Sequence, residues 1–194
     1  MPPHTPTYLS QGPRVGLRPL RAADGPEFTA RVRESRALHE PWLFPPATIE
    51  EYEPYAARLA QGAPGAGFLV CDLADGAIAG FINVNNIVRG AFQCGALGYG
   101  AFAHAAGRGL LGEGLGLLLA YAFAGTGLAL HRLEANIQPG NAASIALVRG
   151  RGFRREGLSP DFLHVAGAWR DHERWALTAP PEPRAGPLRN PDRW

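Results

Sequence analysis

Three strand-like runs follow one another closely between residues 67 and 102, and they constrain the fold more than any other feature. GFLVCDL (67–73) and AIAGFINVNNI (77–87) are separated only by an Ala-Asp-Gly turn, and CGALGYGAF (94–102) comes soon after. Apolar, β-branched and aromatic residues bounded by turn residues are typical of strands, and a short glycine-containing connection is typical of a hairpin. The pattern therefore predicts an antiparallel meander in the middle of the chain.

Helical and further strand patterns flank this meander on both sides. Leucines from Leu110 to Ala124 share one face at helical spacing, which predicts a helix that packs on the sheet. Asp24, Thr48 and Asn141 are suited to cap helices at 26–39, 48–61 and 142–151. Strands are expected at 15–20 and 131–137, and a last pair around 154–158 and 169–178. We expect a single domain over residues 14–178, with irregular proline-rich termini at 1–13 and 179–194.

Composition excludes several classes of function. The 19 basic and 17 acidic residues nearly balance, so direct binding to nucleic acid is not expected, and all basic residues are arginine, which excludes Schiff-base lysines. Cys71 and Cys94 have no metal-binding or disulfide-rich spacing, which favours a reducing, cytoplasmic location. No apolar run reaches the roughly 20 residues that span a bilayer, so we expect no membrane association.

A glycine-rich turn, Gly107-Arg108-Gly109, lies between the meander and the apolar helix. Such a turn before a helix can hold a phosphate on backbone N–H groups, because glycine permits close approach and the helix N-terminus is partly positive. Alone the signal is weak in a chain with 25 glycines. The G-x-G-x-x-G spacing at 107–112 follows an antiparallel meander instead of opening a βαβ unit, which argues against a dinucleotide-binding fold.

Several longer segments, in order, point to one family. They are RALHEPW, NNIVRGAFQCGALGYG, AGRGLLGEGL, LHRLEANIQPGNAASIALVRGRGFRREG and FLHVAGAWRDHERWALT. Over residues 14–178 the chain resembles the RimJ/RimL-like, ribosomal-protein alanine N-acetyltransferase branch of the GNAT superfamily. This resemblance implies an α/β fold in which a mixed, mostly antiparallel sheet splays at its fourth and fifth strands between flanking helices. It also implies acetyl-CoA as cosubstrate and no metal.

The resemblance further implies which residues bind acetyl-CoA. Phe102 and Ala103 are expected in the cleft beside the pantetheine arm, and the pyrophosphate is expected on the loop formed by Ala106, Gly107, Arg108, Gly109, Leu110 and Leu111. The family pattern P-x-N-x-x-S begins here at Pro139. It assigns Asn141 to the pantetheine arm and Ser144 to a hydrogen bond with the departing thiolate. From the residues alone, Asn141 is equally suited to be a helix cap and Ser144 to be an ordinary first-turn residue.

The acceptor side is less clearly defined. The resemblance places Trp42, Phe44, Asn85, Arg89 and Phe92 along the acceptor groove, although Trp42 and Phe92 are also suited to a core.

No general base is evident in the sequence. Glu134 is suited to an ion pair with Arg132, and RimL-type relatives have a glutamate where this chain has Leu163. Asp161, His164, Asp171 and His172 cluster in the last hairpin, on the expected substrate side. A proton relayed through water remains a hypothesis.

The leading functional hypothesis is acetyl transfer to the N-terminal α-amine of a protein or peptide, such as a ribosomal protein. Near pH 7.3 about a fifth of α-amines but only about 0.1% of lysine amines are neutral, so an α-amine needs little help from a base. The alternatives are an acetyltransferase for a small amine, such as an antibiotic, a polyamine or an amino acid derivative, and a non-catalytic acyl-CoA-binding protein. A monomer or a homodimer fits the sequence.

Overall fold

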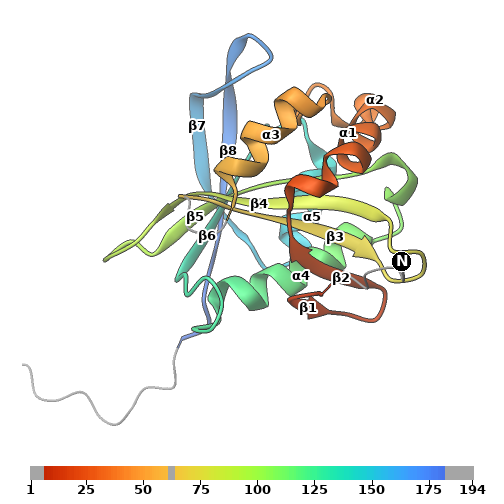
Figure 1. The fold of residues 1–194 in the computed structure, drawn as a ribbon. Coiled ribbons are helices and arrows are strands. Elements are labelled where there is room, and N and C mark those ends of the chain that lie inside the picture. Colours follow the sequence, from red (N-terminus) through yellow and green to blue (C-terminus); the bar gives the residue numbers. More distant parts are fainter. Residues whose placement is uncertain (1–6, 61–63, 182–194) are drawn as a thin grey trace, which may run out of the picture.

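The computed structural model describes residues 7–60 and 64–181, which form one mixed sheet with helices on both faces (Figure 1). The eight strands lie in the order β1-β2-β3-β4-β5-β6-β8-β7, and all neighbours are antiparallel except β5 and β6. The predicted meander is confirmed as β3, β4 and β5. The strands are β1 (Ser10–Gln11), β2 (Val15–Pro19), β3 (Ala66–Asp72), β4 (Ile78–Val88), β5 (Cys94–Ala101), β6 (Arg132–Ile137), β7 (Arg154–Val165) and β8 (Ala168–Thr178).

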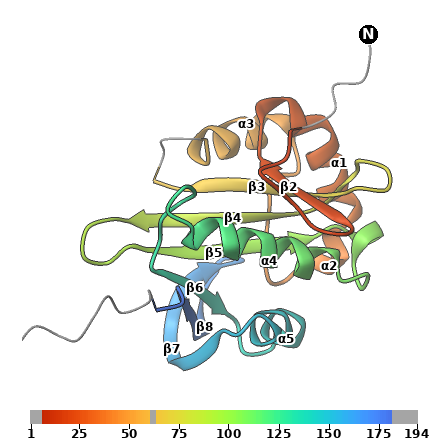
Figure 2. The same ribbon diagram turned by 90° about the horizontal axis from the view of Figure 1, so that it is seen from below.

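The helices divide between the two faces of the sheet, as Figures 1 and 2 show together. One face packs against α1 and α3 around Phe28 and Tyr52, and the other packs against α4 and α5 around Leu115 and Val148. Successive side chains of β3 point to opposite faces of the sheet, so Leu69 packs in the first core and Phe68 and Val70 pack in the second. The helices are α1 (Gly25–Glu34), α2 (Arg36–His39), α3 (Ile49–Arg58), α4 (Leu110–Phe123) and α5 (Ala142–Gly150).

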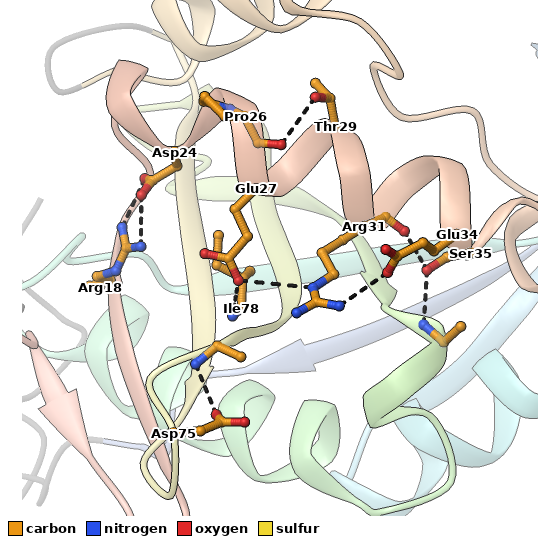
Figure 3. A network of polar contacts seen from close by, with 12 residues as sticks. Arg18, Asp24, Pro26, Glu27, Thr29, Arg31, Glu34, Ser35, Asp75 and Ile78 are labelled. Carbon is orange, nitrogen blue, oxygen red and sulfur yellow. Dashed lines mark hydrogen bonds and ion pairs between the residues drawn. The ribbon is translucent and has the colours of Figure 1, made fainter.

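Two of the three predicted helix caps are confirmed. The Thr48 side chain accepts a hydrogen bond from the Glu51 N–H within a capping box, and Asn141 Oδ1 accepts one from the Ser144 N–H. Asp24 stands at the predicted N-cap position of α1, but the predicted side-chain cap is absent. Its carboxylate instead accepts two hydrogen bonds from the Arg18 guanidinium, at 2.8 and 2.7 Å, and one from the Arg21 N–H in the 3-10 turn before α1 (Figure 3). A nearly buried cation on the adjoining strand binds this carboxylate in place of the helix N–H groups.

The predicted splay lies between β5 and β6, which are the fourth and fifth of the predicted strands because the short β1 was not predicted. Their parallel pairing runs only from Cys94↔Arg132 to Leu97↔Ala135, although β5 continues to Ala101 and β6 to Ile137. Beyond Leu97, β5 therefore has a strand partner on its β4 side alone. Along a strand that is paired on one side only, the backbone N–H and C=O groups that point to the other side have no strand partner. This edge of β5 therefore offers main-chain hydrogen-bonding groups to a ligand.

The terminal segments differ in part from expectation. Residues 10–11, within the N-terminal segment expected to be irregular, pair with β2 and form β1. Residues 1–6 and 182–194 lie outside the described part of the chain, so the proposed domain bounds stay a prediction.

The described residues show neither a membrane-spanning helix nor a metal-binding cluster. No helix there is long and apolar enough to cross a bilayer, and no group of His, Cys, Asp and Glu side chains could hold a metal ion. Cys71 and Cys94 are buried free thiols.

Candidate active site

A cleft of about 450 Å³ begins where β5 and β6 separate. Its walls come from the end of β5, the glycine loop, the first turn of α4, the α2 region and the N-terminal half of α5. A second, smaller cavity of about 150 Å³ continues from it between the diverging strands and reaches β8. Both cavities are lined by Trp42, Leu43, Tyr99, Asn141 and Ser144, so these residues mark the passage between them.

The glycine loop is built to bind an anion. Gly107 and Gly109 have φ values of +75° and +77°, a backbone conformation that other residues rarely adopt. The N–H groups of Gly109, Leu110 and Leu111 have no hydrogen-bond partner within the described residues, because they precede the first i→i−4 bond of α4. Free N–H groups at the N-terminus of a 14-residue helix attract phosphate oxygens, so the loop fits the pyrophosphate of CoA.

Arginines surround this loop, but two of them are already paired. Arg108 donates to Asp72 at 2.8 Å, and Arg14 binds Glu113 while also donating to the Arg108 carbonyl. The Ala74 N–H and the Arg108 guanidinium hold the pKa of Asp72 below its usual value against the effect of burial. Arg108 therefore adds less free charge than the sequence suggested, and Arg14 was not identified from the sequence because it lies far from the loop along the chain.

Phe102 and Ala103 do not line either cavity. The Phe102 ring is fully buried against Phe28 and Phe81 on the α1 side, and the Ala103 N–H donates to Ser35 Oγ at 2.8 Å. In their place, Gly100 and Ala101 lie along the cleft. The predicted contact of Phe102 and Ala103 with the pantetheine arm stays a prediction from the resemblance.

Ser144 lies at the narrow passage, where Tyr99 is its partner. The two hydroxyl oxygens are 2.6 Å apart, and Asn141 fixes the helix start by accepting the Ser144 N–H at 3.1 Å. Burial raises the pKa of Tyr99 to about 12, although the hydrogen bond to Ser144 acts in the opposite direction. Tyr99 thus stays protonated at neutral pH. It can donate to Ser144 Oγ and leave the Ser144 hydrogen free for a ligand.

His39 belongs to the scaffold of the cleft. Its Nε2 lies 2.8 Å from the Ala101 carbonyl, and burial lowers the pKa of the ring. A neutral imidazole there donates to the carbonyl at the end of β5 and holds α2 against the splayed strand.

The predicted acceptor residues separate into two groups. Trp42 lines both cavities and lies over Gly140, and Phe44 lines a neighbouring cavity of about 710 Å³ beside α1, α2 and α3. Asn85, near the end of β4, and Arg89 and Phe92, just beyond it, line neither cavity of the cleft, although the Asn85 side chain lies against Gly98, which lines the smaller one.

These last three side chains have local surroundings of their own. Asn85 accepts from Arg58, Arg89 donates to the Leu128 carbonyl, and Phe92 is 58% exposed in the β4–β5 turn.

The ion pair expected for Glu134 is present. Its carboxylate binds Arg132 at 2.9 Å and Arg174 at 2.8 Å, so both oxygens are occupied. Both oxygens of Glu134 are engaged by guanidinium groups, and the one from Arg174 ties β6 to β8, which gives this residue a structural role.

An anion-binding loop, a splayed strand edge and a buried hydroxyl pair at one cleft are the features expected of an acyl-CoA-dependent transferase. The chain belongs to the GNAT acetyltransferase family: the model of the "Acetyltransferase (GNAT) domain" matches residues 14–154. It is accordingly an enzyme that transfers acetyl groups, with acetyl-CoA as the donor.

Similar proteins include ribosomal-protein modifiers. The chain is 28% identical to a probable N-acetyltransferase, YjcK, of Bacillus subtilis over 89% of this chain and 98% of that one. It is 39% identical to the [ribosomal protein uS5]-alanine N-acetyltransferase of Escherichia coli over about half of each chain, 53% and 52%. The solved structure of Mycobacterium smegmatis RimJ in complex with CoA-disulfide has a TM-score of 0.76 at 31% identity, covering 85% of this chain and 82% of that one.

Proposed function

We propose that this enzyme acetylates the N-terminal α-amine of a protein or peptide, inside the cytoplasm. The observation that carries the proposal is the passage at Tyr99 and Ser144, which opens from the glycine-loop cleft into the space beside β8. Similarity to ribosomal-protein alanine acetyltransferases supports a protein acceptor over a small amine.

The arrangement suits direct transfer of the acetyl group. With the pyrophosphate on the glycine loop, the thioester would reach the passage, where the sulfur comes within range of Ser144. The neutral amine nitrogen forms a bond to the thioester carbon and loses one proton, the C–S bond breaks with its electron pair moving to sulfur, and the thiolate takes up one proton to give the CoA thiol. The Ser144 hydroxyl donates a hydrogen bond to the developing thiolate, and Tyr99 supports it by donating to Oγ.

The proposal is tested by acceptor screening with acetyl-CoA and a thiol-release assay. Peptides starting with alanine or serine should release CoA, whereas the same peptides with a blocked N-terminus and an internal lysine should not. Spermidine and other small amines form the second arm. Turnover on small amines alone would refute the proposal, and CoA binding without turnover on any amine would indicate a non-catalytic acyl-CoA-binding protein.

Ser144→Ala should lower kcat by about 10-fold or more, because a hydrogen-bond donor to the leaving thiolate is lost. The Kd for acetyl-CoA should change little, as measured by calorimetry, since the glycine loop is untouched. A variant with wild-type kcat would remove Ser144 from the mechanism.

Tyr99→Phe should lower kcat less than Ser144→Ala, by about 3- to 10-fold, because one neutral hydrogen bond contributes roughly 0.5–1.5 kcal/mol. In the double variant the Tyr99 effect should disappear, since it acts through Ser144 Oγ. Additive losses in this double-mutant cycle would show that the two hydroxyls act independently.

A further inference from the structure

His172 lies beside the passage, on the face of the sheet opposite α5. Asn136 of β6 and Arg174 of β8 are paired in register, and His172 is two residues from Arg174, so these three residues share one face. Ala135 and Ile137 point to the other face, where they pack in the core with Val148 of α5. His172 and Asn136 nevertheless line the small cavity together with Tyr99 and Ser144, because the strands have separated there.

The hydrogen bond of the His172 ring sets its tautomer. Nδ1 lies 2.8 Å from the Arg170 carbonyl, and a carbonyl can only accept, so Nδ1 carries the proton. Nε2 then has a lone pair. Nε2 has no hydrogen-bond partner among the described residues. It is also not one of the buried polar atoms that have neither a partner nor accessible surface, so Nε2 retains some accessible surface. His172 itself is only 3% exposed, and the cavity is the open space that it lines.

Asn136 adds a second unused acceptor. Its Oδ1 is buried and has no hydrogen-bond partner within the described residues. A buried carbonyl oxygen without a donor is unfavourable, and a ligand N–H is the group that would satisfy it. Asn136 and His172 line the same small cavity, so an amine bound there donates one N–H to Nε2 of His172, and rotation of the Asn136 side chain brings its Oδ1 to a second N–H.

We propose that His172 is the general base of this enzyme and that Asn136 positions the acceptor amine. This inference rests on the proposed acetyl transfer, to which it adds the proton acceptor that the sequence did not reveal. The acceptor arrives as an ammonium group and passes one N–H proton to Nε2 of His172, after which the neutral nitrogen bonds to the acetyl carbon. The C–S bond breaks with its electrons on sulfur, the second proton of the nitrogen passes to the thiolate through solvent, and the imidazolium releases its proton to solvent, so the site returns to its starting charge.

Neighbouring groups set the electrostatic surroundings of this ring. Phe162 of β7 packs edge-on against it, with ring centroids 6.1 Å apart, and Arg174 is engaged with Glu134. The titratable and charged groups of the surrounding strands are Tyr99 of β5, Arg132 and Glu134 of β6, Arg154, Arg155, Glu156, Asp161 and His164 of β7, and Arg170, Asp171, Glu173 and Arg174 of β8.

Two substitutions separate a base from a structural residue. His172→Asn keeps an N–H donor near the position of Nδ1, where it can still reach the Arg170 carbonyl, but it lacks the Nε2 lone pair. His172→Gln places an amide near Nε2 and loses the Nδ1 donor. If His172 only holds the hairpin, the asparagine variant should retain activity. If it is the base, both should lose about 100-fold in kcat/KM near pH 6.5.

The pH profile gives the decisive readout. The acceptor α-amine, with a pKa of about 7.7–8.0, becomes neutral without help as pH rises, so the deficit of both variants should shrink to below about 10-fold by pH 9.5. The exposed His131→Gln is the matched control and should behave as wild type. The Kd for acetyl-CoA should be unchanged in all variants, and thermal melts measure the loss of stability expected in His172→Gln, which lacks the Nδ1 donor to the Arg170 carbonyl.

Asn136→Leu tests the second half of the proposal. It removes the unpaired oxygen at similar volume and should raise the KM for the acceptor by about 10-fold, with little effect on the Kd for acetyl-CoA.

Three results would overturn the assignment of His172: wild-type kcat/KM in both variants, activity restored by asparagine alone, or a deficit that stays constant with pH. An unchanged acceptor KM in Asn136→Leu would overturn the role of Asn136. Failure of the proposed function looks different, because the wild-type enzyme itself would then acetylate no peptide α-amine. In that case the same variants are compared on whichever small amine is turned over, with the pH range moved to the pKa of that amine.

Discussion

Replacing Gly109 by valine should weaken acetyl-CoA binding by about 10- to 100-fold. A β-branched residue at φ +77° carries a strain of roughly 1–3 kcal/mol, which the loop would relieve by turning its N–H groups away from the pyrophosphate. Each 1.4 kcal/mol corresponds to about tenfold in Kd. Calorimetric titration with acetyl-CoA measures the effect directly.

The control for Gly109 is Gly125→Ala. Gly125 lies in open space, is not among the positive-φ residues, and lies beyond the far end of α4 from the loop. Its Kd for acetyl-CoA should equal that of the wild type. A Gly109→Val variant that binds with unchanged affinity would show that the glycine loop does not hold the pyrophosphate.

Asp24→Ala should lower the free energy of unfolding by about 3–5 kcal/mol, because it leaves the Arg18 guanidinium charged, nearly buried and without its partner. Figure 3 shows the pair bridging the end of β2 and the start of α1. Total stabilities are about 5–15 kcal/mol, so urea denaturation should show a large fall in the midpoint.

Glu34→Ala removes a comparable ion pair, with Arg31, at the surface. The Glu34 side chain is 58% exposed, so the change should cost less than about 1 kcal/mol. Equal losses for the two variants would mean that burial does not govern the strength of these pairs.

Periodicity and turn chemistry predicted the secondary structure well, because these signals are local. The capping box at Thr48 and the cap at Asn141 depend only on residues three positions apart. The side-chain cap expected of Asp24 is absent for the opposite reason. Its partner, Arg18, lies on the preceding strand, and local sequence does not reveal that the two side chains meet in a nearly buried position.

The parts of the site formed by the backbone of one short segment were predictable from the sequence. Contacts between side chains from distant segments were less so. The glycine loop follows from its sequence, whereas the Tyr99–Ser144 pair joins residues 45 positions apart. Asn85, Arg89 and Phe92 show a further limit. Family resemblance identified their strand, but at about 3.3 Å per residue the two ends of the 11-residue β4 are far apart. Only the pairing register between β4 and β5 shows which residues of β4 lie near the cleft.

The early end of the β5–β6 pairing also has a kinetic consequence. The gap it leaves opens toward the α4–α5 side through the larger cleft and toward His172 through the smaller cavity. Donor and acceptor can thus enter from opposite sides of one sheet and be bound together, meeting at Tyr99 and Ser144. We therefore expect the acetyl group to pass in a single ternary complex, with neither product leaving before both substrates have bound, and initial-rate kinetics with both substrates varied would test this.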